Sequence, residues 1–232
     1  EYYIGGSAAR SGGITHGQTS WMQTTVNGAG TLSFRWKVIC EDDPDGESWD
    51  YLSFSVDGMP IEAIDGDSGW RMVSVKVKGE GVHSFKWTFC KDEYTDEIYD
   101  DIAWVDQVSW TPTVTAGDLE IPVAWLESVG SHRSVGSSVS AANDDPDGDG
   151  FTTAEEYVMG TDPNDPESKL TAEIEFVNGK PVVRYAPDLK GKRNYVTWGK
   201  RRLDDPKESW APVMQGREGE FKFFKISVEM PK

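Results

Sequence analysis

Alternating apolar and polar residues constrain the fold of this chain more than any other feature of its sequence. The apolar positions recur at every second residue in four runs, which in chain order contain Leu32, Phe34, Trp36 and Val38; Leu52, Phe54 and Val56; Val73, Val75 and Val77; and Phe85, Trp87 and Phe89. A strand turns successive side chains to opposite faces, so each run predicts a strand with one buried face.

Turn-forming residues separate these runs. Val56-Asp57-Gly58-Met59 and Lys78-Gly79-Glu80-Gly81 are typical of hairpin turns. Short strands with such turns between them indicate a β-sandwich or a jelly roll. The sequence therefore predicts an all-β fold, with a jelly-roll β-sandwich over residues 1–114.

The same region resembles a family of bacterial extracellular jelly-roll modules that are similar to MAM and concanavalin-like sandwiches. The matching segments include Asp50–Gly58, Gly81–Trp87 and Ala103–Trp110. The resemblance implies a β-sandwich from a multidomain secreted protein, and it implies no particular activity.

Residues 145–156 have the pattern of a calcium-binding loop. Asp145, Asp147 and Asp149 occupy its first, third and fifth positions, Gly150 occupies the sixth, and Glu156 occupies the twelfth. Four carboxylates around one point repel one another without a cation. An acidic, solvated turn is the alternative, but every position of the calcium template is filled correctly.

The flanks of this loop predict half of an EF-hand. Thr152 or Thr153 can cap a short helix that ends at Gly160, a residue suited to a left-handed turn. The preceding segment, Ser131–Asn143, is rich in Ser and Gly and has no helical period, so no entering helix is expected.

The loop and its flanks resemble the calcium repeats of dockerins and of thrombospondin type 3 repeats. The resemblance covers about residues 143–168 and implies that calcium is bound by Asp145, Asp147, Asp149, the Phe151 carbonyl and Glu156, with help from Asn143, Asp162 or Asn164. A single loop is present and the thrombospondin cysteines are absent, which favours a structural role over docking onto a cohesin.

The rest of the chain is predicted to form two smaller parts. Thr111–Gly117 has the composition of a linker, and a short helix is expected between Pro122 and Gly130, so residues 115–168 are interpreted as linker, helix and calcium segment. Alternation then returns, with a hairpin turn at Asn178-Gly179, so residues 169–232 are expected to form a small β unit that packs on the calcium segment.

Charge limits the possible partners. The formal net charge is −17, which argues against nucleic acid and anionic membranes because both are polyanions. No apolar run approaches the roughly 20 residues that span a bilayer. We expect an extracellular or cell-surface protein, fused to other domains of a larger secreted protein.

Two cysteines follow similar strands. Cys40 ends the run from Leu32, and Cys90 ends the run from Val82. If those strands were neighbours, the two sulfur atoms could form a disulfide in an oxidising compartment. Two free thiols are an equally good interpretation.

Aromatic residues in polar loops are the candidate ligand contacts. Carbohydrate binding commonly uses an aromatic ring that stacks on a sugar and acidic side chains that accept its hydroxyls. The candidate residues are Trp49, Trp70, Tyr94, Tyr99, Asp50 and Asp96. Solvated acidic loops are the alternative. A second cation is possible near Asp43, where the calcium pattern is partly repeated, or near Asp106.

Catalysis has little support in the sequence. His16, His83 and His132 lack the close spacing of a zinc site, and there is neither a G-x-S-x-G elbow nor a catalytic cysteine signature. We therefore expect a non-catalytic secreted accessory module that is stabilised by calcium and binds a polysaccharide. A structural or adhesive spacer of a cell-surface protein or secreted protease is the alternative.

Overall fold

A computed structural model describes residues 1–41, 49–94, 101–130, 138–178, 180–189, 191–202, 204, 206–214 and 221–231. The chain divides into two compact units, Glu1–Thr115 and Ala116–Lys232. Each unit is described by itself.

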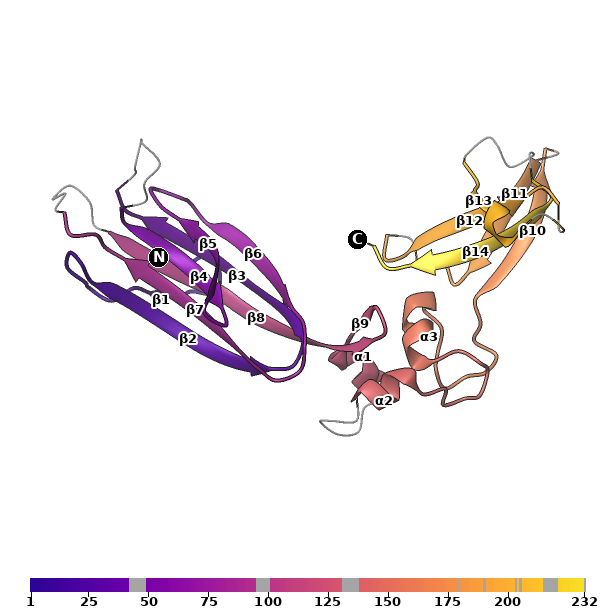
Figure 1. Cartoon of the computed structure of the whole chain (residues 1–232), viewed down its shortest axis with the longest axis horizontal. Helices are drawn as coiled ribbons and strands as arrows, with labels where there is room; N and C mark the ends of the chain where they lie inside the picture. The colour runs from indigo at the N-terminus through magenta and orange to yellow at the C-terminus, as the bar shows by residue number, and fades with distance from the viewer. Residues whose placement is uncertain are drawn as a thin grey trace. The chain divides into compact units, whose positions relative to one another are not determined.

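The first unit is an antiparallel β-sandwich (Figure 1). Its described strands are β1 (Ala9–Arg10), β2 (Thr19–Asn27), β3 (Gly30–Ile39), β4 (Tyr51–Val56), β5 (Met59–Ile64), β6 (Arg71–Val77), β7 (Val82–Cys90) and β8 (Ile102–Ala116). One sheet has the order β1-β8-β3-β6 and the other has the order β2-β7-β4-β5. The neighbouring pairs β1/β8, β2/β7, β3/β6 and β4/β5 are those of a long hairpin rolled into two layers, so the jelly roll is confirmed.

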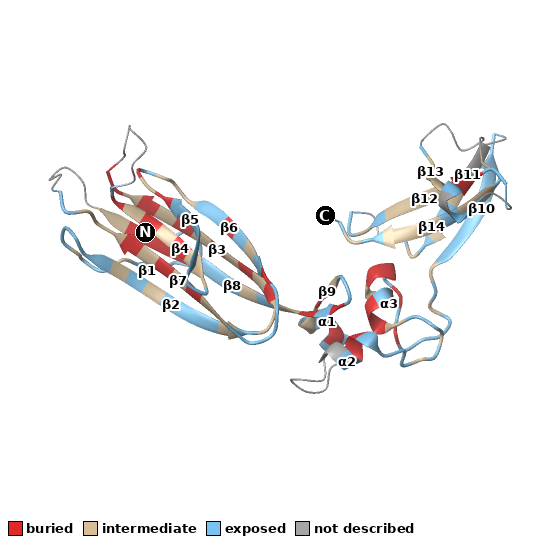
Figure 2. Cartoon of the chain, viewed as in Figure 1, coloured by how far each residue is buried: buried red, intermediate tan, exposed pale blue. Residues whose placement is uncertain are grey.

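Buried aromatic rings fill the space between the two sheets. Buried residues alternate with less buried ones along β3 and β7 (Figure 2). Phe34 lies 4.8 Å from Phe54 and 5.1 Å from Trp87 between ring centroids. Each fully buried side chain of this size contributes roughly 1.5–3 kcal/mol. The predicted hairpin turn also forms, with Asp57 and Gly58 at φ angles of 51° and 79°.

The predicted linker at Thr111–Gly117 is wrong for most of its length. Strand β8 continues to Ala116, and Thr111 and Pro112 pair with Thr31 and Gly30 of β3. Val114 and Ala116 are buried. Thr and Val are typical of strands, whereas Thr, Pro and Gly are also typical of connecting segments, so composition alone could not separate the two.

The two cysteines are free thiols. Their strands do not pair, because β3 and β7 belong to different sheets, and Cys90 follows the inward-facing Phe89 and so points away from the core. The Cys40 thiol donates to the Asp50 carbonyl over 3.2 Å. Burial raises the pKa of Cys40 to about 12, so this thiol stays protonated at neutral pH.

Asp106 of β8 holds the first residues of the chain against the outer face of its sheet. Its carboxylate accepts hydrogen bonds from the backbone N–H groups of Tyr3, Ile4 and Gln107, over 2.8, 3.2 and 2.7 Å. Burial alone would raise the pKa of Asp106, but these three donors outweigh it and the pKa is lowered. Asp106 thus accepts part-buried hydrogen bonds from the backbone, and a second cation near it stays a prediction.

Asp106→Asn is expected to lower the melting temperature at neutral pH, because an amide oxygen accepts less strongly than a carboxylate. A lowered pKa in the folded state stabilises the fold above the unfolded pKa, near 3.9, and this stabilisation disappears as pH falls through the folded pKa. Melting curves of both proteins across pH should therefore converge towards acid. A difference that stays constant with pH would contradict this assignment.

The described part of the second unit contains three short helices and two small sheets. Its elements are β9 (Leu119–Pro122), α1 (Val123–Ser128), α2 (Ser138–Asn143), α3 (Thr153–Met159), β10 (Thr171–Val177), β11 (Lys180–Ala186), β12 (Asn194–Lys200), a 3-10 turn η1 (Lys207–Ser209), β13 (Ala211–Pro212) and β14 (Phe223–Glu229). Strand β10 pairs with β11, and the second sheet has the order β13-β12-β14. Within the described residues, no helix is long and apolar enough to cross a membrane.

The expectation that no helix precedes the acidic loop is wrong, because α2 ends directly before it. This helix has six residues, fewer than two turns, so it leaves no detectable period in the sequence. The helix after the loop forms as predicted. Thr152 and Glu155 make a reciprocal capping box, and Gly160 ends the helix at a φ angle of 76°.

The C-terminal strands contact α3, as expected for a segment too small to stand alone. Arg193, directly before β12, donates from Nε to the Val158 carbonyl over 2.8 Å, and from Nη2 to the Tyr157 carbonyl. Its guanidinium also lies 4.8 Å from the centroid of the Tyr157 ring. These contacts occupy carbonyl groups that have no partner within the helix. Residues 116–232 thus include both the loop and the C-terminal strands in one compact unit.

Candidate functional site

The acidic loop of the second unit gathers the carboxylates that the sequence predicted. Asp145, Asp147 and Asp149 each offer a carboxylate oxygen, and these atoms lie within 4.8 Å of one another. Oxygen ligands 2.3–2.6 Å from one calcium ion lie up to about 5 Å apart. The three side chains are thus close enough to share an ion.

Backbone N–H groups of the loop donate to both carboxylate oxygens of Asp145 and to one oxygen each of Asp147 and Asp149. Asp145 accepts from the N–H groups of Gly148 and Gly150 over 2.8 and 3.0 Å. Asp147 Oδ1 accepts from the Asp149 N–H, and Asp149 Oδ1 accepts from the Phe151 N–H. The second oxygens of Asp147 and Asp149 are buried and have no hydrogen-bond partner.

Glu156, at the twelfth position of the loop, is its most deeply buried acidic residue. Its side chain is 0% exposed, and neither of its carboxylate oxygens has a hydrogen-bond partner. Burial, together with the charges of Asp147, Asp149 and Asp162, raises the pKa of Glu156 to about 7. The nearby Thr161 hydroxyl offsets part of this rise, although the two groups do not meet the geometry of a hydrogen bond.

Unpaired buried carboxylate oxygens are costly, and native proteins seldom leave them. Four such oxygens come from Asp147, Asp149 and Glu156, all within one loop. This arrangement suits a divalent cation with oxygen ligands better than it suits a solvated turn. The predicted participation of the Phe151 carbonyl stays a prediction.

Asn164 and Asp162 hold the segment after α3 in place, and their predicted help in calcium binding stays a prediction. The Asn164 amide donates to the Val129 carbonyl over 2.9 Å and to Asp162 Oδ1 over 3.3 Å. Asp162 Oδ1 also accepts from the Asn164 backbone N–H. The pair therefore ties the segment after α3 to the end of α1.

The candidate ligand residues of the first unit fall into two places. Trp49 and Asp50 precede β4, and Tyr94 follows β7, the strand that pairs with β4. We call the set Trp49, Asp50, Asp92 and Tyr94 the loop end. Trp70 instead precedes β6 of the other sheet, where its ring packs edge-on against Tyr3 at 5.9 Å. Tyr99, Asp96 and Asp43 lie outside the described residues.

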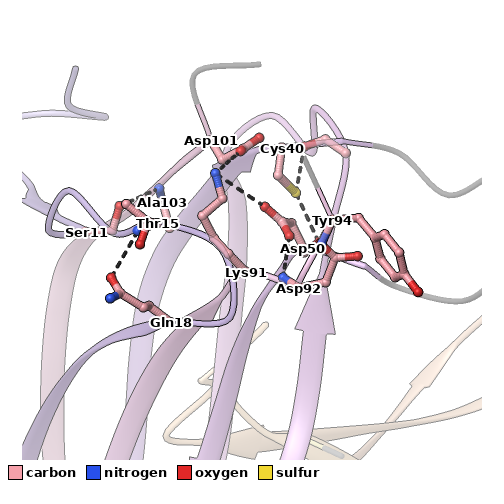
Figure 3. Close-up of polar contacts among 11 residues, drawn as sticks. Ser11, Thr15, Gln18, Cys40, Asp50, Lys91, Asp92, Tyr94, Asp101 and Ala103 are labelled. Carbon is pink, nitrogen blue, oxygen red and sulfur yellow. Dashed lines mark hydrogen bonds and ion pairs between the residues drawn. The ribbon is translucent and has the colours of Figure 1, made fainter. Parts of the chain in front are cut away.

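Exposure differs sharply between neighbours at the loop end. Trp49 is 43% exposed and Tyr94 is 81% exposed, whereas Asp50 is only 2% exposed. Asp50 Oδ1 accepts from the Asp92 N–H over 2.9 Å, and Asp92 Oδ1 accepts from the Tyr94 N–H over 2.8 Å (Figure 3). The expectation that Asp50 contacts a ligand is therefore replaced by a supporting role, in which it fixes the backbone that carries Tyr94.

Lys91 provides the countercharge for this buried acid. Its ammonium group forms an ion pair with Asp101 and lies 3.8 Å from Asp50 Oδ2 (Figure 3). Desolvation would lower the pKa of Lys91, but Asp101 and Asp50 outweigh it and raise the pKa. Glu41, Asp50 and Asp92 also bring carboxylate oxygens within 4.8 Å of one another. Sequence reasoning missed Lys91, although it is the only basic residue in the acidic segment 91–101.

Comparisons with known proteins give distant likenesses only. No family model matches the chain, and no curated protein matches it. The chain is similar to the secreted serine protease VesC from Vibrio cholerae, with 17% identity and a TM-score of 0.39 over 48% of this chain and 22% of the protease. It is also similar to the PA14 domain of the antifreeze protein MpAFP, with 17% identity and a TM-score of 0.21 over 45% of this chain and 47% of that one. The chain spans less than half the length of either structure.

Proposed function

We propose that this chain is a non-catalytic accessory module of a secreted protein, which binds a polysaccharide at the loop end of its β-sandwich. The observation that carries the proposal is the exposure of Trp49 and Tyr94 beside a backbone that hydrogen bonds to Asp50 and Asp92 hold in place. Exposed aromatic rings that gather in one place can mark a binding site. Rings with a fixed backbone bind without a large loss of conformational entropy.

We also propose that the chain binds calcium as a structural ion. Asp145, Asp147, Asp149 and Glu156 would hold it, and the ion would neutralise four carboxylates that otherwise repel one another. The residues fit this ion because Asp147, Asp149 and Glu156 have buried carboxylate oxygens that lack hydrogen-bond donors, and Asp145 brings a carboxylate oxygen within 4.8 Å of those of Asp147 and Asp149. The ion would stabilise the second unit rather than contact the polysaccharide.

Trp49→Ala and Tyr94→Ala are each expected to weaken polysaccharide binding about tenfold or more, because central aromatic residues dominate binding energy. Affinity electrophoresis against a panel of soluble polysaccharides, followed by titration with those that retard the chain, measures this effect. Trp21→Ala is the matched control, since Trp21 is 60% exposed but lies on β2. Equal loss in all three variants, or no retardation by any polysaccharide, would contradict the proposal.

A structural or adhesive spacer is the second candidate, and one observation favours it. Ile174 and Phe176 of β10 are 47% and 71% exposed, on the same face of the strand. Exposed apolar patches of this kind mark contacts with other proteins. The second candidate would be supported if the chain binds no polysaccharide and if Phe176→Ser removes its contact with another protein.

A further inference from the structure

The first residues of the chain lie on the outer face of the β1-β8-β3-β6 sheet as a separate piece, which belongs to no strand and bends at Tyr3 and Ile4. We call Glu1–Ile4 the strap. Gly5 and Gly6 follow it with φ angles of 87° and 88°, and no atom lies within 4 Å of a Cβ built on either glycine. Tyr2, Tyr3 and Ile4 are 53%, 39% and 59% exposed. The strap is therefore joined to the sandwich by a hinge and contributes nothing to its core.

Specific side chains hold the strap to the sheet. Asp106 accepts the N–H groups of Tyr3 and Ile4. Arg35, the cross-strand partner of Asp106, lies 4.0 Å above the centroid of the Tyr3 ring, and Trp70 meets the same ring edge-on. Lys37 forms an ion pair with Glu1 over 2.7 Å. The face thus binds two backbone N–H groups, one aromatic ring and one carboxylate, which a short peptide segment can offer.

The same face has room beside the strap. A groove of about 470 Å³ shares Arg35 with the strap contact and is also lined by Ser33, Met72 and Gln107. At this point a β-bulge shifts the register of β3 against β8 between Ser33 and Arg35, and Gln107 has a φ of 52°. Bulges of this kind redirect side chains and are common next to binding sites.

We propose that this face is a binding site for a short peptide segment of this kind, and that it exchanges its own strap for the strap of a second copy of the chain. The second copy is the occupant that the structure identifies, because an exchanged strap would make the same contacts that the chain makes with its own. The tethered strap has a high effective concentration, in the millimolar range for short flexible linkers. Exchange is therefore favoured at high protein concentration, or when the chain's own strap is weakened. This inference does not depend on carbohydrate binding.

A peptide of residues 1–6 with a fluorophore after Gly6 can stand for the second strap. Tyr3→Ala weakens the chain's own strap but leaves the groove intact, so the full-length variant should bind the peptide at least tenfold more tightly than the original chain. Tyr2→Ala is the matched control, because Tyr2 is an exposed neighbour whose ring, among the described residues, packs against no other aromatic ring. Combining Tyr3→Ala with Asp106→Asn should remove the gain. Binding that is unchanged in Tyr3→Ala, or retained in the double variant, overturns the proposal.

Two variants, one with a weakened strap and one with a weakened groove, should also form a dimer when they are mixed. Tyr3→Ala has an intact groove and a poor strap, whereas Asp106→Asn has an intact strap and a poor groove. Sedimentation velocity of an equimolar mixture should show a heterodimer, while each variant alone stays mostly monomeric. Melting curves of both variants confirm that they are folded before mixing. A mixture that sediments as monomers, at concentrations where the peptide saturates Tyr3→Ala, overturns exchange with a second copy.

Discussion

Addition of EDTA is expected to lower the melting temperature of the second unit, and Glu156→Gln is expected to remove most of this dependence on calcium. A ligand that binds only the folded state at 100 times its dissociation constant stabilises that state by about 2.7 kcal/mol. For a unit of this size, such a loss corresponds to roughly 10 °C. Calorimetry of the full chain with excess calcium and with EDTA measures the shift.

Glu156→Gln is expected to change the stability of the chain in opposite directions with calcium and with EDTA. With calcium, the variant should be less stable than the original chain, because a ligand carboxylate is lost. With EDTA, it should be more stable, because the original chain then keeps a buried carboxylate without a partner. The amide of Gln can also donate to the free oxygens of Asp147 and Asp149.

Glu167→Gln is the control for this experiment, because it removes the same charge from an exposed position outside the loop. It should leave the calcium-dependent shift unchanged. If EDTA has no effect on the original chain, or if Glu156→Gln is less stable in both conditions by the same amount, the calcium assignment is wrong.

The sequence predicted the parts of this fold that depend on local physics. Alternation gave the inward faces of β3, β4 and β7, since strand geometry alone decides which residues share a face. The turn at Asp57-Gly58 and the cap at Thr152 also follow from local backbone preferences. The acidic pattern of residues 145–156 could be recognised for the same reason, because the spacing of its carboxylates is a local feature of the sequence.

The sequence could not show which strands are neighbours or how deeply the residues at strand ends are buried. Alternation does not say which strands are neighbours, so the placement of β3 and β7 in different sheets, and with it the separate fates of Cys40 and Cys90, was open. Trp49 and Asp50 are adjacent in an acidic loop, yet the polar residue is the buried one. Its burial depends on Lys91 and on the Asp92 backbone, which reach it only through tertiary contact.

Lys91→Met is expected to destabilise the β-sandwich by about 3–5 kcal/mol, a large part of the stability of an ordinary domain. The side chains of Lys91, Asp101 and Asp50 are only 11%, 6% and 2% exposed. Methionine fills a similar volume but leaves the two carboxylates without their shared cation. Denaturant unfolding, followed by tryptophan fluorescence, measures the loss, with Lys78→Met at an exposed turn as the control.

A second substitution separates lost charge from lost packing. Asp101→Asn, added to Lys91→Met, removes one of the unpaired charges and should recover much of the lost stability, which a double-mutant cycle quantifies. Asp50 also fixes the Asp92 backbone and, through it, Tyr94. Lys91→Met should therefore weaken polysaccharide binding even where the variant remains folded, and Asp101→Asn should restore it in part. A variant within about 0.5 kcal/mol of the original chain would show that solvent screens these charges and that Lys91 does not support the loop end.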